Sequence, residues 1–176
     1  MRLLPWVIAL GGILLLSKNR RLPNEQLTKD FRLDEFARGE LVKAYLTPDI
    51  IANVKALAQV LQRARNKVNF AIRITSAVRT PAHNAAIGGV PNSQHTFGMA
   101  VDVQPIPNTK ENAKKLWDAL TSGTYDQIIW ENAPYPNGLP SHIHFSYVRP
   151  GSGNAIYKSN RKKKLLYLGG NYTNLI

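Results

Sequence analysis

The residues from His142 to Val148 alternate between polar and apolar side chains, and this alternation constrains the fold more than any other stretch. Successive side chains of a β-strand point to opposite faces, so His142, His144 and Ser146 share one face. The other face carries Ile143, Phe145 and Tyr147. A strand of this kind belongs to a sheet with one face in the core and one face available for polar chemistry.

A second strand with the same pattern is predicted from Ala100 to Gln104. Asp102 lies at the centre of its polar face. The opposite face carries Val101 and Val103. Gly98 lets the chain turn before this strand, so His95 and Asp102 can point to one place.

Helices are predicted to cover the apolar face of the sheet. Thr47-Pro48-Asp49 is typical of a helix start, and apolar residues recur at helical spacing from Ile50 to Leu61. The remaining elements are a second helix over 109–121, capped by Asn108 or Thr109, and strands over 70–74 and 127–130. The predicted fold class is α+β: a small antiparallel sheet that carries Asp102 and His144, with helices 49–65 and 109–121 packed on one side.

The length of 176 residues suits one domain with one core. We expect a hydrophobic N-terminal segment over residues 1–21, a single folded domain over residues 22–150 and a basic C-terminal tail over residues 151–176. The tail begins with the linker-like stretch Gly151-Ser152-Gly153-Asn154.

The chain contains no cysteine, so any metal ion must be held by histidine or carboxylate side chains. Catalytic zinc commonly has three nitrogen or oxygen ligands and one open position. His95, Asp102 and His144 meet this requirement once the two polar strand faces come together. An isolated histidine is usually an ordinary structural residue, but these two segments together predict a zinc site.

Several motifs together carry a family resemblance. Residues 75–84 read TSAVRTPAHN, Gly88-Gly89 follows, residues 93–102 read SQHTFGMAVD, and His142-Ile143-His144 closes the series. With Phe31–Phe36 they resemble the M15 family of zinc peptidases, in particular its small phage and bacterial D-Ala-D-Ala carboxypeptidase-like members. The resemblance runs to about Tyr147.

This resemblance implies a hedgehog/DD-peptidase-like fold and a zinc ion (Zn2+) as cofactor. It also implies that His95, Asp102 and His144 are the metal ligands and that Arg79 orients the substrate. The planar guanidinium of an arginine suits recognition of a carboxylate. A structural ion pair remains the alternative for Arg79.

One departure from the family pattern affects the catalytic assignment. Many members place an acidic residue three positions before the last ligand, where this chain has Ser141. His142 resembles instead the first histidine of the H-x-H arrangement in lysostaphin-type peptidases and the hedgehog signalling domain. We therefore predict His142 as general base or transition-state stabiliser. Glu131 and Asp126 remain candidates for the missing carboxylate.

The resemblance implies hydrolysis of peptidoglycan stem or cross-link peptides, by a carboxypeptidase or an endopeptidase. The alternative is a non-catalytic zinc-binding module of the hedgehog type with a structural or binding role, which the serine at position 141 motivates.

The net charge of +12 first suggests nucleic-acid binding. All 11 acidic residues lie between residues 22 and 148, where 13 basic residues offset them. The excess positive charge belongs to the two ends, so the core domain is not expected to bind nucleic acid.

The N-terminal segment from Leu3 to Leu16 is uncharged but shorter than the ~17 residues a spanning helix needs. We favour a membrane anchor; a signal peptide and a buried or interface-forming segment stay open. The expected localisation is therefore membrane-associated, in a bacterial envelope or a phage virion. Anionic lipid and virion components are further expected partners.

Overall fold

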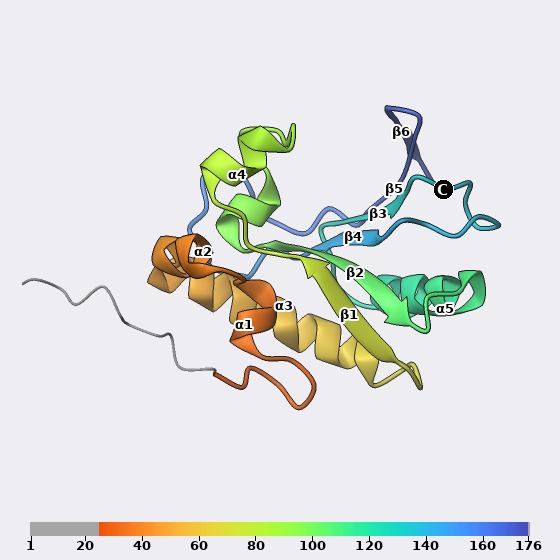
Figure 1. The fold of residues 1–176 in the computed structure, drawn as a ribbon, viewed down its shortest axis with the longest axis horizontal. Helices are drawn as coiled ribbons and strands as arrows, with labels where there is room; N and C mark the ends of the chain where they lie inside the picture. Colours follow the sequence, from red (N-terminus) through yellow and green to blue (C-terminus); the bar gives the residue numbers. More distant parts are fainter. Residues whose placement is uncertain (1–24, 176) are drawn as a thin grey trace, which may run out of the picture.

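The computed structural model describes residues 25–175, which form one open mixed sheet with helices around it (Figure 1). The strand order is β1-β2-β4-β3-β5-β6. In chain order the elements are α1 (Leu33–Phe36), α2 (Glu40–Tyr45), α3 (Pro48–Arg65), β1 (Ala71–Ser76), α4 (Pro81–Ala86), the 3-10 helix η1 (Gln94–Phe97), β2 (Ala100–Ile106), α5 (Lys110–Thr121), β3 (Gln127–Glu131), β4 (Ile143–Ser146), β5 (Lys163–Leu168) and β6 (Asn171–Asn174).

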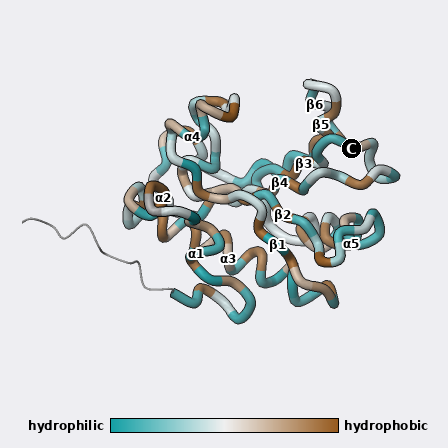
Figure 2. The backbone as a smooth tube through the Cα atoms, viewed as in Figure 1, coloured by the Kyte–Doolittle hydropathy of each residue, from teal (hydrophilic) through white to brown (hydrophobic). Residues whose placement is uncertain are grey.

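The core lies between the apolar face of the sheet and the helices α3 and α5, which lie on the same side of it (Figure 1). Hydrophilic and hydrophobic residues alternate along α3 (Figure 2), as expected of a helix with one buried face. The fully buried side chains include Leu57, Leu61, Val101, Val103, Leu116, Ile128, Trp130, Ile143 and Phe145. The predicted α+β class and both predicted helices are confirmed.

Both long helices begin at a threonine whose hydroxyl caps the first turn. Thr47 Oγ1 accepts a hydrogen bond of 3.2 Å from the backbone N–H of Ile50, and Pro48 occupies the first turn. Thr109 Oγ1 accepts an equivalent bond of 3.2 Å from Asn112. The cap of α5 is therefore Thr109 and not Asn108, because the threonine hydroxyl is the group that reaches an unpaired backbone donor of the first turn.

The sheet departs from the expected antiparallel pairing at one place. β5 pairs in parallel with β3, on the side of β3 that β4 leaves free, and β6 pairs antiparallel with β5. These two strands come from residues 151–176, the segment expected to be a basic tail. Leu165 on β5 is 9% exposed, so the segment contributes an apolar side chain to the packed structure.

The predicted localisation at a membrane is corrected by the structure. Within residues 25–175, no helix is long and apolar enough to cross a bilayer. The segment Leu3–Leu16, on which that prediction depended, lies outside the described residues.

An ion pair between an exposed arginine and a buried carboxylate joins the C-terminal segment to the sheet. The Asp126 side chain is fully buried, and the guanidinium of Arg161 donates two hydrogen bonds to it, of 2.7 and 2.6 Å. Gln94 Nε2 donates a further bond of 2.9 Å to the same carboxylate. Asp126 therefore joins the chain before β5 to the 3-10 helix η1.

Replacing Arg161 with alanine should destabilise the fold, because it leaves a buried carboxylate without its counter-charge. The carboxylate keeps its hydrogen bonds from Gln94 and from the backbone N–H of residue 161, so we expect the free energy of unfolding to fall by about 2 kcal/mol in urea titrations followed by fluorescence. The control is Lys114→Ala, which removes an exposed ion pair with Asp118 and should cost less than about 0.5 kcal/mol. Equal losses in the two variants would contradict this role of the Arg161–Asp126 pair.

Candidate metal centre

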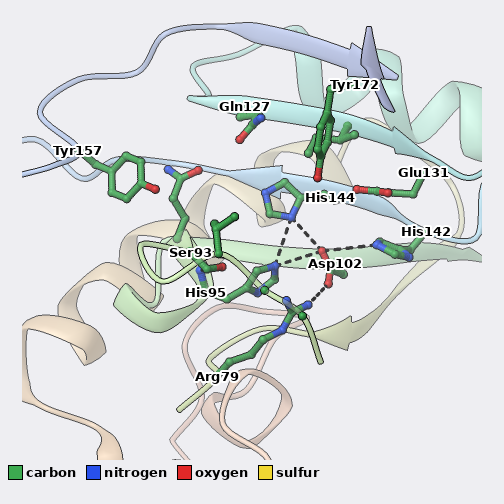
Figure 3. A pocket seen from close by; sticks show the side chains of 15 residues that line it. Arg79, Ser93, His95, Asp102, Gln127, Glu131, His142, His144, Tyr157 and Tyr172 are labelled. Atoms are coloured by element: carbon green, nitrogen blue, oxygen red, sulfur yellow. Dashed lines mark hydrogen bonds and ion pairs between the residues drawn. The ribbon is translucent and has the colours of Figure 1, made fainter. Parts of the chain in front are cut away.

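Three side chains converge because β2 and β4 are neighbours in the sheet. Asp102 and His144 are direct partners in the antiparallel register, so both project from the polar face at one point. His95 reaches the same point from η1. His95 Nε2 lies 3.2 Å from His144 Nδ1 and 3.3 Å from Asp102 Oδ1, and His144 Nδ1 lies 3.0 Å from that oxygen (Figure 3).

The three atoms form a nearly equilateral triangle that fits a tetrahedral metal ion. Zinc holds nitrogen and oxygen ligands at about 2.0–2.1 Å, which places the ligand atoms of a tetrahedral site about 3.3 Å apart. The observed sides of 3.0–3.3 Å match one face of such a tetrahedron. The group can therefore hold a metal ion and leave a fourth position open toward the cleft.

The local backbone fixes the orientation of His95. Its Nδ1 donates a hydrogen bond of 2.7 Å to the carbonyl oxygen of Ala77, so Nε2 carries the free lone pair that a metal requires. Burial lowers the pKa of His95 although Asp102 opposes this shift, and the imidazole is therefore neutral at pH 7.

Gly98 ends η1 with a positive φ of 66°, as the sequence predicts for a turn between His95 and β2. A side chain at this position would also meet Ile50 Cγ2 at 3.0 Å and Val54 Cγ2 at 3.1 Å. The absence of a side chain at Gly98 thus allows the turn that follows His95 to pack closely against α3.

Arg79 lines the cleft, and its guanidinium contacts the carboxylate of Asp102. Its Nη2 donates to Asp102 Oδ2, and its Nε donates a hydrogen bond of 2.9 Å to Ser76 Oγ. Asp102 Oδ1 is left to face the two histidines. Burial alone would raise the pKa of Asp102, but His95 and His144 together hold it well below its usual range. The ion pair expected as the alternative for Arg79 is present, and its role toward a substrate stays a prediction.

His142 lies beside the three converging residues on the same polar face. Its Nε2 is 3.8 Å from Asp102 Oδ1, and its Nδ1 is 3.1 Å from Ser141 Oγ. Burial lowers the pKa of His142 although Asp102 opposes this shift, so its ring is neutral at pH 7. The Ser141 hydroxyl also lies 3.4 Å from the Glu131 carbonyl oxygen, so its single proton serves one of these two acceptors. When it serves Nδ1, the N–H of the neutral ring is on Nε2.

Glu131 is the carboxylate that enters the cleft. It ends β3 directly beside Ser141, whose backbone N–H donates a hydrogen bond of 2.9 Å to the Glu131 carbonyl. The neighbouring strand therefore places a carboxyl group beside position 141. Burial, together with the charge of Asp102, raises the pKa of Glu131 to about 7.

Asp126, the other sequence candidate, does not line the cleft. Its carboxylate is occupied by Arg161 and Gln94. His83 is exposed and also lies outside the cleft. Of the acidic candidates flanking the 127–130 strand, only Glu131 lies among the residues that line it.

The cleft has a volume of about 380 Å³ and is bordered by two tyrosines that sequence reasoning missed. Tyr157 comes from the loop after β4 and Tyr172 from β6, and both point toward the metal-site residues (Figure 3). Neither residue belongs to a recognisable motif. Only the return of the C-terminal segment to the sheet brings them to the cleft.

Comparison with known families gives one match. Residues 29–130 match the family model described as Peptidase M15. The matched region holds Arg79, His95 and Asp102, and it ends before β4, which carries His144. No curated protein matches the chain.

Replacing His144 with alanine should abolish stoichiometric zinc binding, because it removes one of three donor atoms. His95→Ala and Asp102→Ala should behave in the same way, as measured by metal content per chain after dialysis against zinc. His83→Ala is the matched control and should keep its zinc. Full zinc occupancy in His144→Ala would show that the ligand set is wrong.

The contribution of Glu131 to the stability of the metal-free protein should fall as the pH rises from about 4.5 to about 7, because Glu131 ionises less readily when folded. His95 and His142, whose pKa values burial lowers, act in the opposite direction, so the effect is read against a variant at position 131. Below this range the Glu131 carboxyl is protonated in both the folded and the unfolded protein. Within this range its ionisation costs free energy only in the folded protein, where the carboxyl is buried. Glu131→Gln cannot ionise, so its melting temperature relative to the wild type should rise across this range. A constant difference between the two proteins would exclude a raised pKa.

Proposed function

Since the chain belongs to the peptidase M15 family, we propose that it is a zinc-dependent peptidase that hydrolyses peptidoglycan stem or cross-link peptides. The observation that carries the zinc dependence is the triangle of donor atoms from His95, Asp102 and His144, with sides of 3.0–3.3 Å. A zinc ion held there would polarise a peptide carbonyl and lower the pKa of a water molecule.

Glu131 is the proposed general base. It is a largely buried carboxyl in the same cleft, and its pKa of about 7 suits proton transfer near neutral pH. It accepts the proton of the attacking water and can return it to the amine that leaves.

His142 is the proposed donor to the oxygen that becomes negative in the transition state. Its neutral ring presents an N–H on Nε2 toward the site when Ser141 donates to Nδ1. The position of Nε2 near Asp102 supports this role, and proton abstraction remains the alternative role predicted for this residue.

Arg79 is proposed to position Asp102 through their ion pair. By occupying Oδ2, the guanidinium leaves Oδ1 as the oxygen that faces His95 and His144. This is a supporting contact of the kind that orients metal ligands elsewhere.

A digestion of purified peptidoglycan, read by mass spectrometry of released fragments, tests the proposal. We expect zinc-dependent release of peptide products, and their masses distinguish a carboxypeptidase from an endopeptidase. Glu131→Gln should lower the rate by about 10²–10⁴ and lose the acid limb of the pH profile. His142→Ala should lower the rate by about 10²–10³ and keep that limb.

Both variants should keep their zinc, which separates them from the ligand substitutions. A wild-type protein that binds zinc but releases no fragments would favour the alternative of a non-catalytic zinc-binding module. The carboxyl of Glu131 in the cleft weighs against that alternative, because a purely structural site has no need of a buried base.

A further inference from the structure

Tyr172 lies at the cleft although it comes from the last strand of the sheet. It is the only residue of β6 among those lining the cleft in the described part of the chain. Figure 3 shows its ring extending from β6, with the hydroxyl end pointing toward His144 and Glu131. β6 lies beyond the residues that the family model matches, so that match assigns no role to this side chain.

The sheet fixes the position of this ring. Tyr172 and Tyr167 are direct partners in the β5–β6 register, and their ring centroids are 4.7 Å apart. Tyr167 is in turn the register partner of Glu131 across the parallel β3–β5 pair. Its carbonyl oxygen accepts a hydrogen bond of 2.7 Å from the backbone N–H of Asn132. Two rows of backbone pairing thus place Tyr172 beside the end of β3 that carries Glu131.

The hydroxyl of Tyr172 is a hydrogen-bond donor that the protein itself does not use. Among residues 25–175, no hydrogen bond to it is found, although Tyr157, the other tyrosine of the cleft, donates to the carbonyl of Asn92. Tyr172 is 62% exposed, so its hydroxyl is accessible to solvent and to a ligand. Partial burial, with the charges of Glu131 and Asp102, raises the pKa of Tyr172, so the phenol keeps its proton at neutral pH.

Tyr172 adds a donor to those that already line the cleft, which include the side chains of His142 and Gln127. Arg79 is engaged with Asp102 and Ser76, and Glu131 is an acceptor when ionised. A peptide presents a carbonyl oxygen at every residue, and each one requires a donor when it leaves water. The hydroxyl of Tyr172 matches this requirement on the side of the cleft opposite Arg79 (Figure 3).

We propose that Tyr172 is a substrate-contacting residue whose hydroxyl donates a hydrogen bond to a carbonyl oxygen of the peptide in the cleft. The proposal rests on the peptide specificity of the proposed function. It gives the C-terminal hairpin β5–β6 a role in substrate binding, in addition to extending the sheet.

Binding of a synthetic peptidoglycan stem pentapeptide to the zinc-loaded full chain tests the contact. The peptide is titrated calorimetrically into Glu131→Gln protein, so that it is not consumed, with and without Tyr172→Phe. Loss of one neutral hydrogen bond should raise Kd about three- to tenfold. Tyr167→Phe is the matched control, because it removes the same group from the same hairpin outside the cleft lining, and its Kd should stay within about twofold.

An unchanged Kd in Tyr172→Phe would overturn the proposal, and so would an equal loss in Tyr167→Phe. Turnover by the wild type is measured in parallel and tests the proposed function separately. If the wild type binds the pentapeptide but does not cleave peptidoglycan, the proposed function fails, and the Kd ratio still decides the role of Tyr172. If the wild type shows neither binding nor cleavage, both proposals fail.

Discussion

The arrangement of the site depends on one buried carboxylate, that of Asp102. Only 4% of this residue is exposed, and an ionised carboxylate at that depth is stable only when both oxygens have partners. Oδ2 is paired with Arg79, and Oδ1 faces His95 and His144. The same contacts that stabilise the charge also bring the three potential metal-ligand atoms of His95, Asp102 and His144 close together. Stability and metal-site geometry therefore have a common cause.

A sheet with two different faces keeps this charged cluster apart from the core. Alternation along β2 and β4 sends Asp102 and His144 to the polar face, while Val101, Ile143 and Phe145 pack toward the helices. Because the side-chain period of a strand is two, a slip of one residue would exchange the two sets. The register of β2 with β4 is therefore set by burial on one face and used for chemistry on the other.

The side chains that line the cleft come from several neighbouring strands and not from one sequence motif. Glu131 enters the cleft from β3, and a backbone hydrogen bond joins it to Ser141, where the family resemblance leads us to expect an acidic residue. Next to β3 in the sheet, the C-terminal strands β5 and β6 contribute a further side chain to the cleft, because their pairing places Tyr172 beside Glu131. The cleft is thus assembled by strand adjacency, from residues far apart in the chain.

The sequence alone determined the parts of this protein that depend on local periodicity and spacing. Polar and apolar alternation predicts β2 and β4 and their faces, and helical spacing predicts α3. A capping residue at position 108 or 109 predicts the start of α5, and the glycine at position 98 predicts the turn beside His95. Tertiary structure decided the parts that depend on which strands become neighbours. The parallel β3–β5 pair, the burial that raises the pKa of Glu131 and the approach of Tyr172 all arise from contacts between distant segments. No local pattern encodes such contacts, because they follow from the free energy of packing the whole chain.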